Sequence, residues 1–154
     1  MNKKDTVVFD LDGTLLDTLE DLKNSVNYAM TQCGYPEHTL DEVRRYVGNG
    51  ILLLMQRAIP GGKDDPNFDK AFTLFKEHYG KHCNDTTKPY AGIMELLHTL
   101  KENNIKIAIV SNKADFAVKE LNAIYFKDLI LVAIGEKESE GIRKKPAPDT
   151  VIEA

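Results

Sequence analysis

Two aspartates, Asp10 and Asp12, stand one residue apart directly after a short apolar segment near the N-terminus. That segment, Thr6–Phe9, is rich in β-branched and aromatic residues, which is typical of a buried strand. Ligands of open α/β sheets bind at the carboxyl ends of the strands, so carboxylates at this point indicate a ligand-binding or catalytic site. Gly13 follows, and its missing Cβ permits a positive φ. The structural alternative is a strand-to-helix turn with ordinary Asp-Gly turn chemistry.

Two later segments carry polar residues in comparable positions. Ser111 and Asn112 follow the apolar stretch 105–110, and a hydroxyl with backbone N–H groups can hold a phosphate at a helix N-terminus. The same residue types are also ordinary loop formers and helix caps. A basic cluster ends at Lys145, and its charge alone indicates no more than a solvated surface.

The elements that must position these residues alternate between strand and helix. After a polar linker at 84–92, the apolar patterns predict four elements. They are a helix from 93 to 100, a strand at 105–110, a helix with Ala117, Leu121 and Ile124 on its apolar face, and a strand at 129–134. With the strand at 6–9 this order favours right-handed parallel crossovers, so we predict an α/β fold. The near-continuously apolar strands fit a sheet covered on both faces.

Residues 19–83 contain only helical patterns. We expect the apolar pattern that resumes at Leu15 and Leu16 to continue as a helix, and Thr39 with Glu42 forms a capping box before the next one. A stripe of Phe and Tyr between residues 68 and 79 predicts a core-facing helix. Gly48-Asn49-Gly50 interrupts the helical pattern, either as a simple break between two helices or as a functional loop.

Composition excludes several classes of function. The chain has 154 residues and a net charge of −4, so it lacks the basic footprint of a nucleic-acid or anionic-membrane binder. Its apolar runs are too short to span a bilayer, and the N-terminus lacks a secretion signal. Cys33 and Cys83 are too few for a disulfide framework or a zinc site. We therefore expect a cytoplasmic protein without nucleic-acid or membrane partners.

Three segments together resemble the motifs of the haloacid dehalogenase superfamily of phosphohydrolases. The run from Asp10 to Thr14 resembles the first motif, Asp-x-Asp-Gly-Thr. The strand that ends in Ser111 resembles the second, and Lys145-Pro146-Ala147-Pro148 resembles the third. On this resemblance Lys145 is preferred as the catalytic lysine, although the sequence does not exclude Lys144.

The resemblance implies a role for each of these residues. Asp10 would be the nucleophile that forms an aspartyl-phosphate, and Asp12 the general acid and base. The Asp10 carboxylate and the Asp12 backbone carbonyl would be ligands of Mg²⁺. Gly13, Thr14 and Ser111 would bind the phosphate, and Asn112 would support them through its backbone. The second aspartate argues against a dehalogenase or a phosphonate hydrolase.

The resemblance also implies a domain organisation and a substrate class. Residues 1–18 and 84–154 would form a Rossmann-like α/β phosphatase core, and residues 19–83 an inserted all-helical cap. Gly48, Asn49 and Gly50 would then face the active site and help to select the substrate. With its helical cap and three segments, 46–50, 89–92 and 110–113, the chain looks most like the phosphoglycolate phosphatase group. This likeness implies a small phosphorylated metabolite as substrate. Relatives that hydrolyse pyrophosphate, sugar phosphates or nucleotides, and a non-catalytic interaction protein on the same scaffold, are the alternatives.

The end of the chain carries a further expectation. The resembled family has a fourth motif of acids that complete the Mg²⁺ site, and no segment here matches it. We therefore expect a core whose C-terminal part is missing, as in a fragment of a longer chain. The strand at 6–9 would be left as an exposed apolar edge open to self-association. The 154 residues alone would bind Mg²⁺ weakly and show little or no phosphatase activity.

Overall fold

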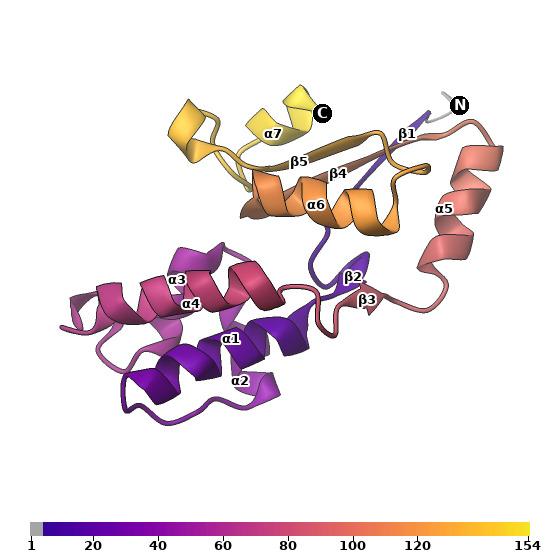
Figure 1. The fold of residues 1–154 in the computed structure, drawn as a ribbon. Helices are drawn as coiled ribbons and strands as arrows, with labels where there is room; N and C mark the ends of the chain where they lie inside the picture. The colour runs from indigo at the N-terminus through magenta and orange to yellow at the C-terminus, as the bar shows by residue number, and fades with distance from the viewer. Residues whose placement is uncertain (1–4) are drawn as a thin grey trace. The chain divides into compact units, whose positions relative to one another are not determined.

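The chain folds as two compact units (Figure 1). The computed structural model describes residues 5–154. One unit ends at Leu16 and resumes at Pro89, and the other runs from Asp17 to Lys88. The first contains a parallel sheet with helices and the second is built from helices, which confirms the predicted α/β class.

The sheet of the α/β unit consists of parallel strands in the order β1-β4-β5. Val8 of β1 pairs with Ala108 of β4, and Ile109 of β4 pairs with Ala133 of β5. The strands are β1 (Thr6–Phe9), β4 (Lys106–Ala114) and β5 (Val132–Glu136), and the helices are α5 (Ile93–Glu102), α6 (Asp115–Tyr125) and α7 (Asp149–Glu153). Figure 1 shows α6, in orange, running alongside β4 and β5, which it contacts.

The core of this unit lies between the sheet and its helices. Ile107 and Ile109 of β4 supply the sheet side, while Leu97 of α5 and Leu121 of α6 supply the helix side. The other fully buried members are Leu11, Leu15, Leu16, Val118, Phe126 and Ile130. Three of them, the leucines, belong to the segment that follows β1. Burial of a leucine side chain stabilises by about 2 kcal/mol, so this segment is anchored on both sides of Asp12.

Several predicted boundaries and faces are wrong, and each has a physical reason. Leu16 does not begin a helix but lies in the short strand β2 (Leu16–Asp17), which pairs with β3 (Lys88–Pro89). The strand β4 continues past Val110 to Ala114, because its backbone still pairs with β5 there. The strand β5 begins only at Val132, because the turn that follows α6 draws Ile130 into the core.

The outer positions of β1 and α6 are more exposed than their apolar side chains suggest. Val8 of β1 is 42% exposed, and Thr6 is exposed as well. β1 is the end strand in the order of the described sheet. Ile124 of α6 is 52% exposed, so it does not lie on the buried face, where Val118 packs instead. Apolar side chains at sheet edges and on the outer faces of helices are often exposed, so an apolar residue type does not by itself predict burial.

The helical unit has its own core. Its helices are α1 (Leu19–Gln32), α2 (Leu40–Tyr46), α3 (Ile51–Ala58) and α4 (Phe68–His82), with a short 3₁₀ helix, η1 (Gly62–Asp64). α1 and α4 pack along each other, and Val26, Met30, Phe75 and Tyr79 meet in the core. The aromatic stripe of α4 is therefore a core feature. No helix among residues 5–154 is long and apolar enough to span a membrane.

The helix boundaries in this unit follow from local sequence. Thr39 accepts the backbone N–H of Glu42, whose side chain in turn accepts the backbone N–H of Thr39, so the predicted capping box is confirmed. Gly48 and Gly50 have φ values of +113° and +89°, a region that L-residues rarely adopt. These two glycines end α2 and allow α3 to begin, which confirms the predicted break in the helical pattern.

A buried carboxylate ties the start of α1 to the segment that follows α4. Asp21 is 1% exposed and accepts hydrogen bonds from the backbone N–H and hydroxyl groups of Thr86 and Thr87, at 2.7–3.0 Å. Burial alone would raise the pKa of Asp21, but these bonds outweigh it and the pKa is lowered. Asp21 is thus an ionised structural residue that fixes where the helical unit begins and ends.

Replacing Asp21 by alanine should destabilise the protein by about 3 kcal/mol, because buried N–H and hydroxyl groups would lose a charged acceptor. Urea unfolding at pH 7 measures this loss. The stabilisation by Asp21 is present above its ordinary pKa of 3.8 and is lost as the pH falls through the lowered folded-state pKa. The difference between wild type and variant should therefore shrink in acid.

The matched control is Glu20→Ala, one residue earlier on α1. Glu20 forms a surface ion pair with Lys23, so its removal should change the free energy of unfolding by less than about 1 kcal/mol. Equal losses for the two variants would contradict the structural role of Asp21.

Candidate active site

The segment after β1 is a tight loop built around one carbonyl oxygen. The Leu11 carbonyl accepts backbone N–H groups from Thr14, Leu15 and Leu16 at 3.0–3.2 Å. Gly13, with φ of +76°, donates its own N–H to the Leu16 carbonyl at 2.9 Å, as its glycine character predicted. The N–H groups of Gly13 and Thr14 are therefore used inside the loop, which leaves the exposed Thr14 side chain as the group that can face a ligand.

Asp10, at the carboxyl end of β1, lies against a lysine that is distant in sequence. Lys145 Nζ donates to Asp10 Oδ1 at 2.8 Å and to the Val110 carbonyl at 2.9 Å. The Lys145 side chain is 31% exposed and the Asp10 side chain is 41% exposed, so the pair is open to solvent. Lys144 instead pairs with Glu138 at 3.3 Å. Of the two lysines considered, only Lys145 contacts the first aspartate.

Asp12 has a cationic partner that the sequence analysis missed. Lys113 Nζ donates to Asp12 Oδ1 at 2.9 Å, and the Lys113 side chain is 5% exposed while that of Asp12 is 28% exposed. Lysine is rarely buried without a paired charge. A lysine three residues beyond the apolar stretch 105–110, near the sheet edge expected for the two aspartates, is the signal that could have identified it.

The two residues that precede Lys113 also make contacts within the site. Ser111 Oγ accepts the backbone N–H of Lys113 at 3.1 Å, and its O–H remains a donor. The side-chain amide of Asn112 donates to the Lys145 carbonyl at 3.1 Å. The carboxyl end of β4 thus contacts both segments that carry the other candidate residues.

A salt bridge braces the loop that carries Lys145. Arg143 donates from its guanidinium to both carboxylate oxygens of Asp149, at 2.9 and 2.7 Å, and from its backbone N–H at 3.2 Å. The guanidinium holds the pKa of Asp149 below its ordinary value. The bidentate pair spans residues 143–149 and closes a short loop around Lys145.

Because Gly135 has no side chain, the backbone of β5 can pass close to the backbone of Lys113 and Asp115. A Cβ at this position would lie 2.4 Å from the Asp115 Cα and 2.5 Å from the Lys113 carbonyl oxygen. The Gly135 N–H donates to Asp115 Oδ1 at 2.9 Å. Burial opposes ionisation of Asp115, but this bond and Lys119 outweigh it and lower the pKa. Gly135 was not identified from the sequence, because the close approach is a tertiary contact.

The residues Gly48, Asn49 and Gly50 belong to the helical unit. Arg57 of α3 holds this loop, because its guanidinium donates to Asn49 Oδ1 at 3.0 Å and to the Tyr46 carbonyl at 2.7 Å. The loop is therefore a braced turn with two positive-φ glycines, and its part in substrate selection stays a prediction.

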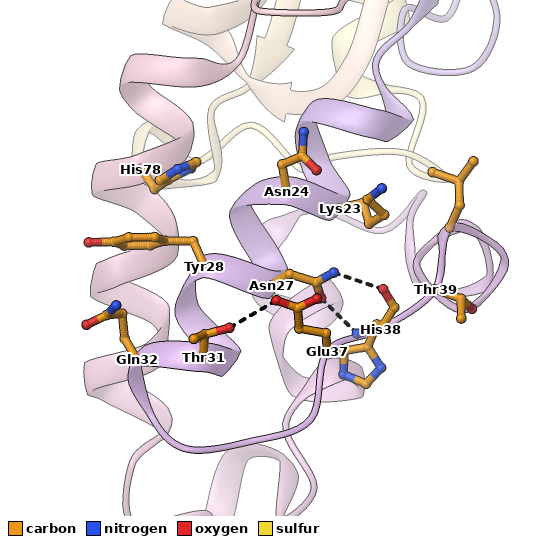
Figure 2. A pocket seen from close by; sticks show the side chains of 11 residues that line it. Lys23, Asn24, Asn27, Tyr28, Thr31, Gln32, Glu37, His38, Thr39 and His78 are labelled. Carbon is orange, nitrogen blue, oxygen red and sulfur yellow. Dashed lines mark hydrogen bonds between the residues drawn. The ribbon is translucent and has the colours of Figure 1, made fainter.

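The helical unit also contains a polar groove, with a cavity of about 540 Å³ between α1 and the segment before α2 (Figure 2). Some of its polar groups are hydrogen-bonded to one another. The side chain of Asn27 exchanges two hydrogen bonds with the backbone of His38, at 2.8 and 2.9 Å, and Thr31 donates to Glu37 at 3.2 Å. None of the candidate residues named above lines this groove.

An aromatic stack closes one side of the same groove. The rings of Tyr28 and His78 stack at 4.4 Å, and His78 Nδ1 lies 2.9 Å from Ser25 Oγ. Burial, and then the charge of His82, lower the pKa of His78, which favours a neutral ring. These contacts join α1 to α4, so the groove is explained by packing between helices.

The site offers few oxygen ligands that could contribute to a Mg²⁺ site. Among residues 5–154 no cluster of three or more His, Cys, Asp or Glu side chains could hold a metal. Mg²⁺ prefers oxygen ligands and commonly keeps several waters on one or two carboxylates. The partly exposed Asp10 carboxylate, together with a backbone carbonyl, meets that minimum.

Comparison with known proteins identifies the family. A family model described as haloacid dehalogenase-like hydrolase matches residues 7–154. The chain belongs to this family. The match covers the α/β unit from β1 onward together with the whole helical unit, so the resemblance seen in the motifs is confirmed.

Curated relatives of this family member are bacterial phosphoglycolate phosphatases. That of Nitrosospira multiformis is 33% identical over 153 residues, which cover 96% of this chain and 66% of the relative. That of Thiobacillus denitrificans is 36% identical over 113 residues, covering 71% of this chain and 50% of the relative. The aligned part of the chain thus spans about half to two-thirds of the length of these relatives.

A solved structure shares the whole fold. The crystal structure of a Lactobacillus delbrueckii protein assigned as a phosphoglycolate phosphatase superposes with a TM-score of 0.91 at 33% identity. The superposition covers 98% of this chain and 72% of the other. The predicted Rossmann-like core with an inserted helical part is therefore confirmed.

Replacing Gly135 by alanine should destabilise the protein by about 3 kcal/mol, because the three atoms nearest the new methyl group all belong to the backbone. The displacement should also disturb the backbone amide signals of Lys113 and Asp115 in a ¹H–¹⁵N spectrum. Urea unfolding and that spectrum are the two measurements.

Gly80→Ala is the matched control, because Gly80 lies on α4 with open space around its Cα. Alanine there should be neutral or stabilise by up to about 1 kcal/mol. A Gly135→Ala protein as stable as wild type would show that the close approach is not a constraint.

Proposed function

We propose that the protein is a Mg²⁺-dependent phosphomonoester hydrolase that acts through an aspartyl-phosphate on Asp10. The observation that carries the proposal is the pair of aspartates at one sheet edge, each with its own ammonium partner: Asp10 with Lys145 and Asp12 with Lys113. Membership in a hydrolase family supports the same chemistry.

The electrostatic problem of the reaction explains why a lysine faces the nucleophile. A phosphate monoester is a dianion, and two like charges at about 4 Å repel by roughly 4 kcal/mol at an effective dielectric constant of 20. In the proposal Lys145 offsets this repulsion while Asp10 attacks phosphorus. The same ammonium stabilises the negative charge on the transferring phosphoryl group. Because Lys145 also donates to the Val110 carbonyl, its head group is fixed before the substrate arrives.

Asp12 is assigned the proton transfers. Its protonated carboxyl would donate to the oxygen that leaves with the alcohol, and the resulting carboxylate would then take a proton from the water that attacks the aspartyl-phosphate. The phosphate on Asp10 is released as inorganic phosphate and Asp10 is regenerated. Ser111, Asn112 and Thr14 would bind the phosphate oxygens, with the Ser111 hydroxyl and the Thr14 side chain as the groups best able to do so. Gly13, expected to bind the phosphate as well, would instead shape the loop, because its N–H is donated to the Leu16 carbonyl.

Mg²⁺ would be held by the Asp10 carboxylate and the Asp12 backbone carbonyl. When bound, the ion would lower the charge repulsion between the carboxylate and the phosphate and orient them.

The proposed substrate is a small phosphorylated metabolite, with phosphoglycolate as the first candidate. Its support is the naming of the relatives from Nitrosospira multiformis and Thiobacillus denitrificans as phosphoglycolate phosphatases. Gly48, Asn49 and Gly50 are proposed to influence the choice among substrates. Pyrophosphate, sugar phosphates and nucleotides are the competing substrates to be tested in a panel. We expect the reaction to take place in a reducing, cytoplasmic setting.

A second candidate function is binding or interaction without turnover. The observation that favours it is that residues 5–154 contain no cluster of three acidic or other metal-ligating side chains. A chain of this kind would bind phosphate or a phosphorylated molecule and release it unchanged.

Asp10→Asn should abolish all Mg²⁺-dependent hydrolysis of p-nitrophenyl phosphate, because an amide cannot form the acyl-phosphate. Even a low wild-type rate suffices for the comparison, and mass spectrometry of acid-quenched protein should find one phosphoryl group on wild type alone. Asp128→Asn, a change at an exposed carboxylate of the same unit, should leave the rate unchanged.

The outcomes separate the two candidate functions. Undiminished hydrolysis by Asp10→Asn would remove this residue from the nucleophile role. Phosphate binding by wild type without hydrolysis of any member of the panel would favour the interaction protein.

Self-association through β1 is a further expectation, since β1 ends the strand order of the described sheet and carries the exposed Val8. Val8→Lys should shift the protein toward monomer in sedimentation velocity at about 100 µM, which lies within the µM–mM range in which unpaired strand edges make a protein prone to associate. A monodisperse wild-type monomer would contradict the expectation.

A further inference from the structure

Lys113 is a buried cation placed directly against the proposed acid and base. Its side chain is 5% exposed, and its ammonium lies 2.9 Å from Asp12 Oδ1. Burial of an ammonium group is unfavourable unless a charge and hydrogen bonds compensate for it. A solvent-exposed lysine would avoid this unfavourable burial of its ammonium group, so the buried position of Lys113 needs a physical explanation.

The backbone of β4 is irregular where Lys113 stands. Val110 pairs with Ile134 and Ala114 pairs with Glu136, so four residue steps on β4 face two on β5. Extra residues in one strand form a bulge, which re-aims the side chains that follow it. The bulge spans Ser111 to Lys113, and it contacts Asp12 through Lys113 and the loop that carries Lys145 through Asn112.

Contacts on two sides hold Lys113 in that bulge. Its backbone N–H donates to Ser111 Oγ at 3.1 Å, and its carbonyl oxygen lies where a side chain on Gly135 would collide with it. A long side chain with four rotatable bonds loses much conformational freedom when its head group is fixed. Because the backbone of Lys113 is already fixed, less conformational entropy is lost when its ammonium group is held in place.

The Asp12 carboxylate is held by only one of its two oxygens. Oδ1 accepts the Lys113 ammonium, and within residues 5–154 no other hydrogen bond to this carboxylate is present. The backbone of Asp12 is already fixed by the loop around the Leu11 carbonyl. The second oxygen, Oδ2, is therefore the one that can meet a bound molecule.

We propose that Lys113 is a positioning residue, which holds Asp12 by Oδ1 so that Oδ2 is presented to the leaving-group oxygen. The proposal rests on the proposed function for its chemical meaning, but the geometric part stands by itself. In this proposal the two lysines have different roles. Lys145, 31% exposed, faces the nucleophile and the phosphoryl group, whereas the buried Lys113 acts through Asp12.

The decisive measurement is the χ1 rotamer of Asp12 in labelled protein, read by NMR from the three-bond coupling between its backbone nitrogen and Cγ. In wild type, a single staggered rotamer should give a coupling at one extreme. In Lys113→Met the coupling should move to the average of the staggered rotamers. Lys113→Gln provides a second, smaller and uncharged variant in case the methionine variant does not fold, and it should behave in the same way.

Reciprocal controls use the parallel ion pair. Lys145→Met should average the rotamer of Asp10 and leave that of Asp12 unchanged, while Lys113→Met should do the opposite. Lys119→Met, which removes an exposed lysine, should change neither. A single Asp12 rotamer that persists in a folded Lys113 variant would overturn the proposal.

Hydrolysis supplies a second readout that a merely structural role would not move. An activated aryl leaving group needs little protonation, whereas the alkoxide from phosphoglycolate needs it fully. Lys113→Met should therefore lose at least about tenfold more kcat with phosphoglycolate than with p-nitrophenyl phosphate, a part of the usual general-acid contribution. Equal losses on both substrates would overturn the positioning role. Absence of turnover by wild type would count against the proposed function, and the rotamer measurement would still decide the role of Lys113.

Discussion

The arrangement of the α/β unit depends on balancing two carboxylates at one sheet edge. Asp10 and Asp12 are separated by a single residue, and Leu11 between them is fully buried. The backbone is therefore fixed, and the two charges cannot separate freely. The ammonium groups of Lys145 and Lys113 satisfy this constraint at 2.8 and 2.9 Å, each on a different aspartate. Because the lysines come from β4 and from the loop before α7, the balance of charge joins three distant segments.

The carboxyl end of β4 is the physical link between these segments. The Val110 carbonyl and the Asn112 amide both contact Lys145, while Lys113 contacts Asp12. A regular strand would direct alternate side chains to opposite faces, whereas the bulge between Val110 and Ala114 allows neighbouring residues to serve the same edge. The missing side chain of Gly135 leaves the room that this bulge occupies.

The sequence predicted those features whose physical cause is local. The strand at Thr6–Phe9, the capping box at Thr39 and the positive φ of Gly13 follow from residue types within a few positions. The partnership of Lys113 with Asp12 joins residues 101 positions apart, and the role of Gly135 depends on a backbone that packs against it. Neither leaves a periodic pattern in the chain. The same limit explains why β4 was predicted to end at Val110: apolar character stops there, although backbone pairing continues.

Stability alone gives a poor account of the lysine at position 113. An apolar side chain of similar size would fill the same space without desolvating an ammonium group, and such replacements of buried ion pairs are often neutral or stabilising. The surrounding structure nevertheless fixes this lysine through Ser111 and Gly135 and keeps its head group on Asp12. Titratable groups held in such costly surroundings concentrate at functional sites. The buried pair therefore makes better sense as a device that orients Asp12 than as a contribution to the free energy of folding.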